Sequence, residues 1–326
     1  MYEQINIFDL TLPTFQIDKP IRLIELFAGI GSQAMALRGL GVDFEHYRVV
    51  EFDKYAIKSY NAIHGKNFPV TDITQLKGKD LGITETDKYC YIMTYSFPCQ
   101  DLSLAGKRKG MKKGNNTRSS LLWEVERLLV QTRCLPQVLL MENVPQVHKQ
   151  ENMTDFQKWI DFLGSMGYSS YWQDLNAKDY GVAQNRNRCY MVSILGEYNY
   201  KFPNPTPLQK TMKDYLEDEV EEKYYINTEK ARKLIRELVK NGTLRDDRDY
   251  EMEGNYNQSG IVHGENSICR TILGAANGGN EPKICVDLSV KEPKKITVGN
   301  CITEKDRGIS SQKQIGNGVI ECQKRY

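Results

Sequence analysis

The first 195 residues alternate apolar runs with stretches of helical periodicity. Runs rich in β-branched and other apolar residues, typical of buried strands, occupy residues 21–27, 47–51, 88–97, 136–142 and 188–195. Helical patterns follow at residues 32–40, 53–63, 119–130 and 154–166. Alternating strands and helices predict an α/β fold, Rossmann-like and doubly wound, with a mostly parallel sheet covered on both faces.

The residues that follow the strands are polar or conformationally special. A glycine turn follows the first run, while Glu51, Cys99 and Glu142 stand at or just after the ends of later runs. In open α/β sheets, ligands bind beyond the carboxyl ends of the strands. We therefore expect these residues to meet in one crevice.

The pattern changes after Leu195. A proline-rich segment, KFPNPTP, is followed by an acidic stretch and then by an amphipathic helix over residues 227–242. Asn227 or Thr228 can cap this helix, and Gly242 can end it. Its expected apolar face consists of Ala231, Leu234, Ile235, Leu238 and Val239. The remainder is rich in Gly, Asn and Ser, so we expect two domains, residues 1–195 and 196–326.

Composition indicates a folded globular protein but does not select one functional class. The chain has 326 residues, 40% hydrophobic and 26% charged, as in folded globular proteins. A net charge of +2 does not by itself indicate a nucleic-acid partner. The 8 cysteines are scattered and only 4 histidines are present, which gives no support for a zinc site. Without a signal-peptide core or a long apolar stretch, we expect a cytoplasmic protein that does not bind membranes.

The segment FAGIGS, residues 27–32, has the composition of a tight turn that leads into a helix. Glycines at 29 and 31 let the backbone bend and approach a ligand closely. Glu51 could accept hydrogen bonds from ribose hydroxyls, and Asp72 could contact an adenine amine. A nucleoside ligand and an ordinary turn flanked by two exposed acids both fit this pattern, which is neither GxGxxG nor a phosphate loop.

Cys99 stands at the end of an apolar run and precedes a basic segment. That segment contains Lys107, Arg108, Lys109, Lys112, Lys113 and Arg118, with no acid between them. A positive field favours the nucleophilic thiolate and an anionic partner such as a phosphate backbone. The alternative is a core cysteine beside a solvated charge run.

Three further charged residues lie at strand ends. Glu142 ends an apolar run, so its carboxylate needs a partner and could bond to the edge of a base. Arg186 and Arg188, two residues apart, are expected to point the same way toward one site. The alternatives are that Glu142 is a structural carboxylate with its hydrogen bonds satisfied within the protein and that the two arginines are a surface pair.

Four segments in this order resemble motifs of the DNA (cytosine-5) methyltransferases, notably of phage and restriction–modification types. They are ELFAGIGS, SFPCQDLS, MENV and QNRNR, and the resemblance covers about residues 21–195. It implies S-adenosylmethionine bound by Phe27, Gly29, Gly31, Glu51 and Asp72, with Phe97 and Pro98 beside it. It also implies Cys99 as nucleophile, with Glu142, Arg186 and Arg188 around a flipped cytosine and Lys107, Arg108, Lys109, Lys112 and Lys113 on the DNA.

The resemblance implies covalent catalysis. Addition of the Cys99 thiolate at C6 of cytosine would make C5 electron-rich enough to take a methyl group, while Glu142 stabilises the developing charge. The base must leave the duplex for this. The implied partners are double-stranded DNA and a cognate restriction endonuclease, and we expect a monomer.

The sequence also departs from the family. Tyr95 and Ser96 stand where glycines are usual, and Leu102 stands where phenylalanine is frequent. The family's arginine-rich segment after the target-recognition region is not found, although QIGNGV resembles the last motif and would place Asn317 at the donor site. Residues 196–326 are thus a complete divergent or a truncated recognition region. A tRNA cytosine-5 methyltransferase and an inactive nucleic-acid-binding remnant stay open.

Overall fold

The structure is a computed structural model. It describes residues 12–99, 101–102, 110–114, 117–216, 225–226, 229–243, 245, 247, 249–251, 261–264, 266–270, 283–287 and 296–300. The chain forms two compact units: Met1–Leu175 with Asn187–Pro203, and Asn176–Arg186 with Asn204–Tyr326. The unit boundaries do not coincide with the expected single division after residue 195, since the chain passes between the units three times. The expected roles of the two regions stay predictions.

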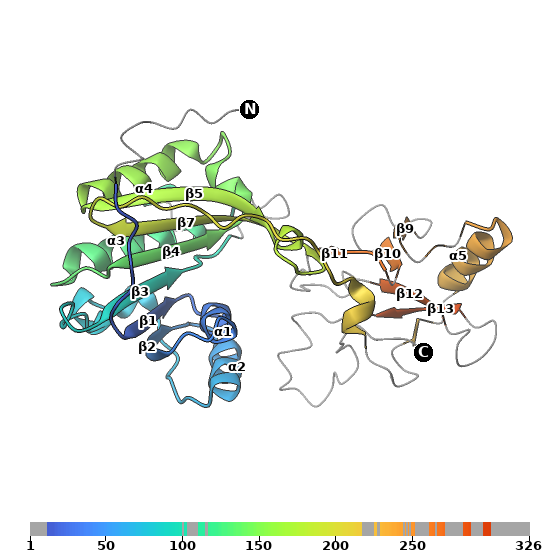
Figure 1. Ribbon diagram of the computed structural model, residues 1–326, viewed down its shortest axis with the longest axis horizontal. Helices are drawn as coiled ribbons and strands as arrows, with labels where there is room; N and C mark the ends of the chain where they lie inside the picture. Colours follow the sequence, from blue (N-terminus) through green and yellow to red (C-terminus); the bar gives the residue numbers. More distant parts are fainter. Residues whose placement is uncertain are drawn as a thin grey trace. The chain divides into compact units, whose positions relative to one another are not determined.

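The first unit is built on a six-stranded sheet (Figure 1). Its strands are β1 (Ile21–Leu26), β2 (Phe44–Val50), β3 (Cys90–Tyr95), β4 (Val138–Asn143), β5 (Tyr168–Asn176) and β7 (Asn187–Leu195). Their spatial order is β2-β1-β3-β4-β7-β5. The pairs β1–β2, β1–β3 and β3–β4 are parallel, whereas β4–β7 is antiparallel. The expected mostly parallel sheet is confirmed.

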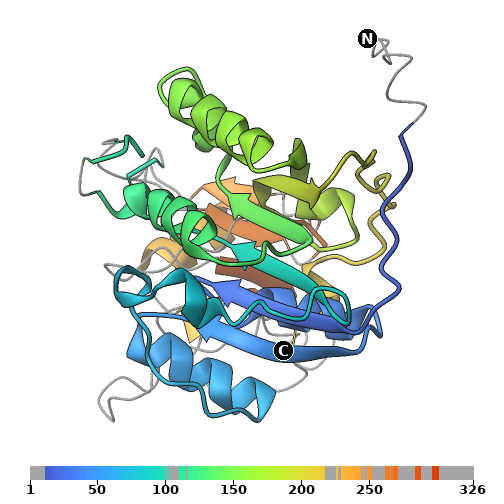
Figure 2. The same cartoon turned by 90° about the vertical axis from the view of Figure 1, so that its left-hand side faces the viewer.

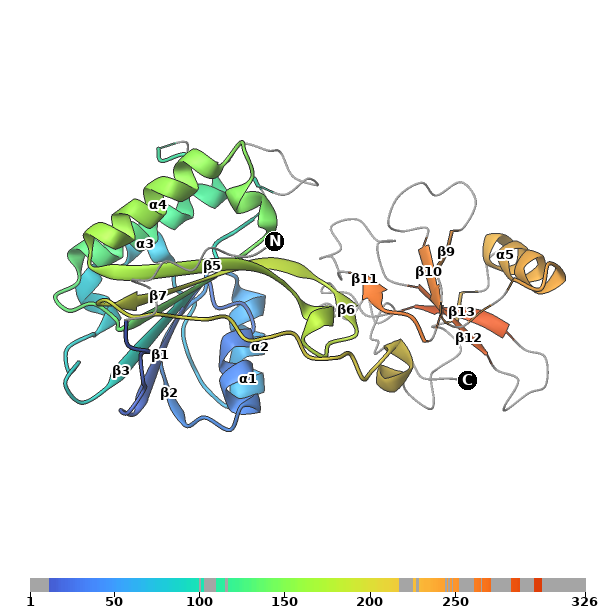
Figure 3. The same cartoon turned by 45° about the horizontal axis from the view of Figure 1, so that its top comes forward.

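Helices cover both faces of this sheet (Figure 3). They are α1 (Ser32–Gly39), α2 (Lys54–His64), α3 (Leu122–Gln131) and α4 (Met153–Ser165). Short 3-10 helices are η1 (Ile73–Gln75), η2 (Gly78–Leu81), η3 (Arg118–Leu121), η4 (Pro145–His148), η5 (Ala177–Asp179) and η6 (Met212–Tyr215). Successive strand residues alternate between the faces: Tyr91 packs with α3 and α4, and Ile92 packs with α1.

The register shows that the parallel strands end at the same level, and Figure 2 shows these strands side by side in the sheet. Leu26 pairs with Val50 and with Tyr95, and Tyr95 pairs with Met141. Because β7 runs the other way, its first residues lie at this same edge, where Cys189 pairs with Asn143. The register therefore places these strand ends at one edge of the sheet, and the expectation that Glu51, Cys99 and Glu142 meet in one crevice there stays a prediction.

The second unit contains a five-stranded sheet of order β8-β13-β12-β10-β9. Its strands are β8 (Tyr225–Ile226), β9 (Asp249–Glu251), β10 (Ile261–Gly264), β12 (Lys283–Asp287) and β13 (Ile296–Asn300), while β6 (Gln184–Asn185) pairs with β11 (Cys269–Arg270). The predicted helix is present as α5 (Glu229–Lys240), and Gly242 follows it with φ 60°.

The apolar face of α5 is narrower than expected. Ala231 is buried with Leu234, Ile235 and Leu238 packed around it, but Val239 is 53% exposed, so its inclusion in that face was wrong. The expected caps, residues 227 and 228, lie outside the described residues. Among the helices that the structure describes, none combines the length and the apolarity that crossing a bilayer requires.

Candidate active site

The glycine turn joins β1 to α1 through left-handed backbone conformations. Phe27 has φ 57°, Gly29 has φ 56°, and Gly31, with φ 82°, caps α1. A non-glycine residue in this region is uncommon and marks a constrained turn. The Gly29 N–H donates to Glu51 Oε2 at 2.8 Å, which ties the turn to the end of β2.

Glu51 and Asp72 lie in neighbouring segments, because the Thr71 N–H donates to the Glu51 carbonyl oxygen at 2.8 Å. Glu51 Oε1 also accepts from the Asp53 N–H at 2.7 Å. Asp72 caps η1 by accepting from the Thr74 N–H at 2.9 Å. A carboxylate has about four acceptor positions, so both acids keep capacity for a ligand.

Phe52 is a candidate that the sequence reasoning missed. Its side chain is 73% exposed although it directly follows Glu51 at the ligand-binding edge of the sheet. An exposed aromatic ring here offers a flat apolar surface beside an acceptor of hydroxyl groups. An aromatic residue after the acid that ends the second strand was the available signal.

A polar network lies beneath the turn, on β1, β2, α1 and α2. The fully buried Glu25 accepts from the Tyr60 hydroxyl at 2.5 Å and from the Ala34 N–H at 3.3 Å. Tyr60 also bonds His46 Nδ1 at 2.7 Å. Burial raises the pKa of Glu25 and lowers that of His46 to about 4, so burial disfavours the charged form of each.

The loop that carries Cys99 is anchored from both sides. The Asn143 side-chain amide donates to the Phe97 carbonyl at 2.9 Å, and the Ser119 hydroxyl donates to the Pro98 carbonyl at 2.6 Å. Cys99 itself is half-buried. The Phe97 side chain is 2% exposed and belongs to the main core. This loop therefore lies beside the end of β4, with a partly accessible thiol.

The structure explains two departures from the family pattern. The Tyr95 side chain is buried on the face of the sheet that packs against α4, and its hydroxyl accepts from Trp159 Nε1 at 3.1 Å. Ser96 Oγ accepts from Gln33 Nε2 at 3.1 Å, which connects the Cys99 loop with the start of α1. Both side chains have defined partners where the family usually has none.

Hydrogen bonds to Asp101 hold the backbone of the basic segment at Gly110 and Arg118. The Gly110 N–H donates to the Asp101 carbonyl at 3.1 Å, and the Arg118 N–H donates to Asp101 Oδ2 at 2.8 Å. Lys112 is exposed, whereas Lys113 pairs with Glu126 at 2.7 Å. Lys113 is thus held against α3, a contact that the acid-free local sequence did not reveal. Asp101 therefore binds the backbone at Gly110 and at Arg118, through its carbonyl oxygen and its carboxylate respectively.

Glu142 and Arg188 form an ion pair across β4 and β7, with Arg188 Nε 3.0 Å from Glu142 Oε1. Their side chains are 22% and 15% exposed, so both are accessible to a ligand only in part. Arg186 belongs to the second unit, where its N–H donates to Asn176 Oδ1 at 3.0 Å. The expectation that both arginines reach one site stays a prediction.

Some expected site residues lie outside the described residues. These are Lys107, Arg108, Lys109 and Asn317. Their expected contacts with DNA and with the methyl donor stay predictions.

One cluster has the composition of a metal site. The ligand atoms of His148, Asp174 and Cys189 lie within 4.8 Å of one another. His148 Nε2 and Asp174 Oδ1 are already 2.8 Å apart, as a hydrogen-bonded pair. Burial raises the pKa of the Cys189 thiol to about 12, which disfavours the thiolate that binds metals. We therefore assign no metal to this cluster.

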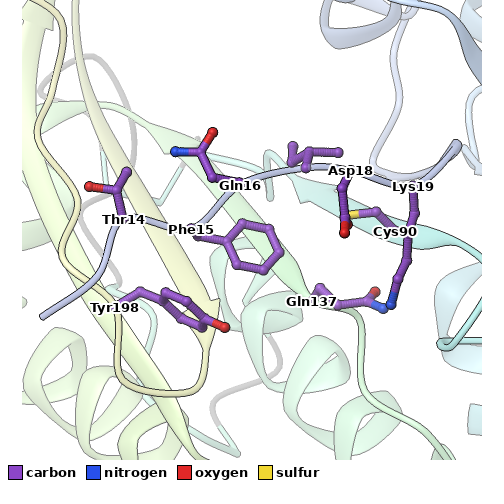
Figure 4. Close-up of a pocket in the computed structure, with 9 residues that line it drawn as sticks. Thr14, Phe15, Gln16, Asp18, Lys19, Cys90, Gln137 and Tyr198 are labelled. Carbon is purple, nitrogen blue, oxygen red and sulfur yellow. The ribbon is translucent and has the colours of Figure 1, made fainter.

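A cavity of about 330 Å³ lies at the opposite ends of the strands (Figure 4). Its lining includes Lys19, which precedes β1, Cys90, the first residue of β3, and Gln137, which precedes β4. Since Glu51, Cys99 and Glu142 follow the carboxyl ends of their strands, this cavity is separate from the candidate active site.

Comparisons with known proteins identify the family of this chain. Residues 21–319 match the family described as C-5 cytosine-specific DNA methylase. The type II methyltransferase M.NlaX of Neisseria lactamica is 32% identical over 280 residues, 85% of this chain and 82% of that protein. The orphan methyltransferase M.SPRI of Bacillus phage SPR is 29% identical over 343 residues, 92% of this chain and 74% of that protein.

Solved structures share the fold. The Entamoeba histolytica methyltransferase EhMeth has a TM-score of 0.60 at 19% identity, covering 85% of this chain and 78% of its own. S. pombe Dnmt2 methyltransferase has a TM-score of 0.57 at 21% identity, covering 82% and 77%. The fold and the family match together make this chain a Rossmann-like methyltransferase. The chain belongs to the C-5 cytosine-specific DNA methylase family and is a DNA cytosine methyltransferase.

Proposed function

We propose that the chain binds S-adenosylmethionine at the glycine turn and methylates C5 of a flipped-out cytosine in a specific DNA sequence. The observation that carries this proposal is the meeting of the Cys99 loop with the Glu142–Arg188 pair at one edge of the sheet, joined by the Asn143–Phe97 hydrogen bond. The nucleophile and a partly accessible carboxylate then stand at adjacent strand ends.

The residues at the turn fit the donor. A Cβ added at Gly29 meets no atom within 4 Å, so the backbone there faces open space. Glu51 would accept from the ribose hydroxyls, Phe52 would pack on the adenine ring, and Asp72 would accept from its amine. Phe27, Gly31, Phe97, Pro98 and Asn317 complete the proposed cofactor set. When bound, the sulfonium supplies an electrophilic methyl group.

The protein's own residues would activate C5 of cytosine so that it can accept the methyl group. The Cys99 thiolate adds to C6, forming an S–C6 bond while the C5–C6 π electrons move toward C5. Glu142 would hold the ring nitrogen and the amine, and Arg188, paired with Glu142, keeps that carboxylate oriented. Arg186 is also proposed to orient the base. After methylation, loss of the C5 proton restores the double bond and expels the thiolate.

DNA contacts are proposed for the basic segment. Lys112 is exposed, and Lys107, Arg108 and Lys109 would add further phosphate contacts. Lys113 would have to leave Glu126 in order to join them. Because phosphate contacts release counterions, affinity should fall steeply with salt. We further propose that the protein acts as a monomer and that its methylation protects sites from a cognate restriction endonuclease.

The test combines methyl transfer with adduct trapping. Purified protein, tritiated S-adenosylmethionine and unmethylated genomic DNA should give labelled DNA, and sequencing of 5-methylcytosine should reveal one site. Cys99→Ser should abolish labelling. The matched control is Cys134→Ser, which changes another half-buried cysteine, located after α3 in the sequence.

Two outcomes of the labelling experiment would contradict the proposal. Labelling of tRNA but not of DNA would favour the alternative substrate, and a folded protein that labels neither would favour an inactive remnant. A duplex with 5-fluorocytosine at the mapped site should trap a covalent complex, and peptide mapping should find the adduct at Cys99. An adduct at any other side chain would overturn the assigned mechanism.

A further inference from the structure

His64, at the end of α2, contacts the glycine turn directly. Arg38 Nη2 lies 2.7 Å from His64 Nδ1, and His64 Nε2 lies 3.0 Å from the Ile30 carbonyl oxygen. A guanidinium can only donate, so Nδ1 must be the acceptor and the ring proton must be on Nε2. Nε2–H then donates to Ile30, and only the neutral Nε2–H tautomer satisfies both contacts.

The ring also packs against the turn. A Cβ added at Gly31 would overlap His64 Nε2 and would lie 2.6 Å from Tyr60 Cε2. Ile30 stands between the two turn glycines, and the neighbouring Gly29 N–H bonds the Glu51 carboxylate at 2.8 Å. The position of the Ile30 peptide therefore sets the position of the backbone that the methyl donor would contact.

We propose that His64, oriented by Arg38, is a positioning residue for the methyl-donor site, which fixes the glycine turn through the Ile30 carbonyl and loosens it on protonation. This inference rests on the proposed binding of S-adenosylmethionine at that turn. His64 touches neither donor nor base, so its effect should appear in cofactor affinity rather than in the chemical step.

The surroundings give the sign of the pH effect. Facing His64 are Arg38 from α1, Tyr60 from its own helix, His46 from β2 with ring centroids 5.0 Å apart, and Lys66 just after α2. Burial lowers the pKa of His64; the hydrogen bond to the Ile30 carbonyl raises it, and the charges of Arg38 and Lys66 lower it, so that the net shift is downward. A proton added to Nδ1 removes the acceptor for Arg38 and places two cations in contact. Acid should therefore weaken cofactor binding.

The experiment measures S-adenosylhomocysteine affinity by calorimetry on the full chain, from about pH 7.5 down to the lowest pH at which circular dichroism shows the chain folded, because the pKa of His64 is lowered. His64→Phe keeps a ring but removes both hydrogen bonds, and we expect affinity about tenfold weaker. His64→Gln keeps an amide donor for Ile30 and should retain most of the affinity without the decline in acid. Lys58→Ala, an exposed change on the same helix, is the matched control and should behave as wild type.

A ratio of wild-type to His64→Gln affinity cancels the titrating groups that His64 does not contact, and repeating it in a His46→Gln background removes the neighbouring imidazole as well. If wild type binds no S-adenosylhomocysteine, the proposed cofactor site fails. If wild type binds and the ratio stays constant with pH, the inference is overturned. Should His64→Phe fail to fold, Arg38→Met gives the second test: it leaves the ring but removes its donor, and an unchanged affinity would also refute the role.

Discussion

Alanine at the two turn glycines should have different effects, because only one position is crowded. Both residues have positive φ, 56° at Gly29 and 82° at Gly31, where a Cβ costs about 1–2 kcal/mol. At Gly29 nothing lies within 4 Å of the added Cβ. At Gly31 it overlaps His64 and Tyr60, and Tyr60 is fully buried and cannot move aside. Overpacking adds about 1–3 kcal/mol there.

We therefore expect Gly31→Ala to lose about 2–5 kcal/mol of unfolding free energy and Gly29→Ala about 1–2 kcal/mol. Urea unfolding followed by tryptophan fluorescence measures this in the right unit, because all 3 tryptophans, Trp123, Trp159 and Trp172, lie in the first unit. Equal losses for the two variants would show that packing of α2 against the turn does not constrain Gly31, and the reasoning would be refuted.

Glu142→Gln should lower methyl transfer about 10²–10⁴-fold with S-adenosylhomocysteine affinity unchanged, since it removes the charge paired with Arg188; weakened cofactor binding would contradict this. His46 takes its proton at about 4 in the folded state against 6.5 ordinarily, so stability should rise with pH between these values. Because the ring is half-exposed, this gain in unfolding free energy is limited to about 1–2 kcal/mol. In His46→Gln, the unfolding free energy measured with urea should vary less with pH over that range. Asp101→Ala removes the side-chain acceptor of the Arg118 N–H and so loosens the end of the basic segment; filter binding should detect weaker DNA affinity, with cofactor affinity as the control.

Local patterns predicted five of the six strands of the first unit's sheet and the four α-helices that the structure describes there. Strand ends at Leu26, Tyr95 and Asn143 follow from apolar runs that stop at polar or special residues, and parallel strands necessarily bring their carboxyl ends to one edge. The Rossmann-like fold and the family are confirmed. Strand β5 was missed because its sequence, YSSYWQDLN, is polar and mostly only half-buried, without the apolar run of a central strand.

Contacts between distant segments could not be predicted in the same way. The pairing of Lys113 with Glu126 depends on how the basic segment folds back on α3, and the Arg38–His64–Ile30 contacts depend on the packing of α2. Arg186 was expected to act with Arg188 because alternate strand residues share a face. The strand begins at Asn187 and Arg186 belongs to the other unit, so the alternation rule applies to Arg188 only, and the joint role of the two arginines stays a prediction.

The path of the chain between its units has a practical consequence for engineering. Residues 176–186 belong to the second unit although both neighbouring segments belong to the first, and their strand β6 pairs with β11 near residue 269. A chimaera that transplants only the portion after Pro203 would separate β6 from its native mate. Exchanging the whole second unit between relatives therefore calls for two grafts made together, with junctions at 175/176, 186/187 and 203/204.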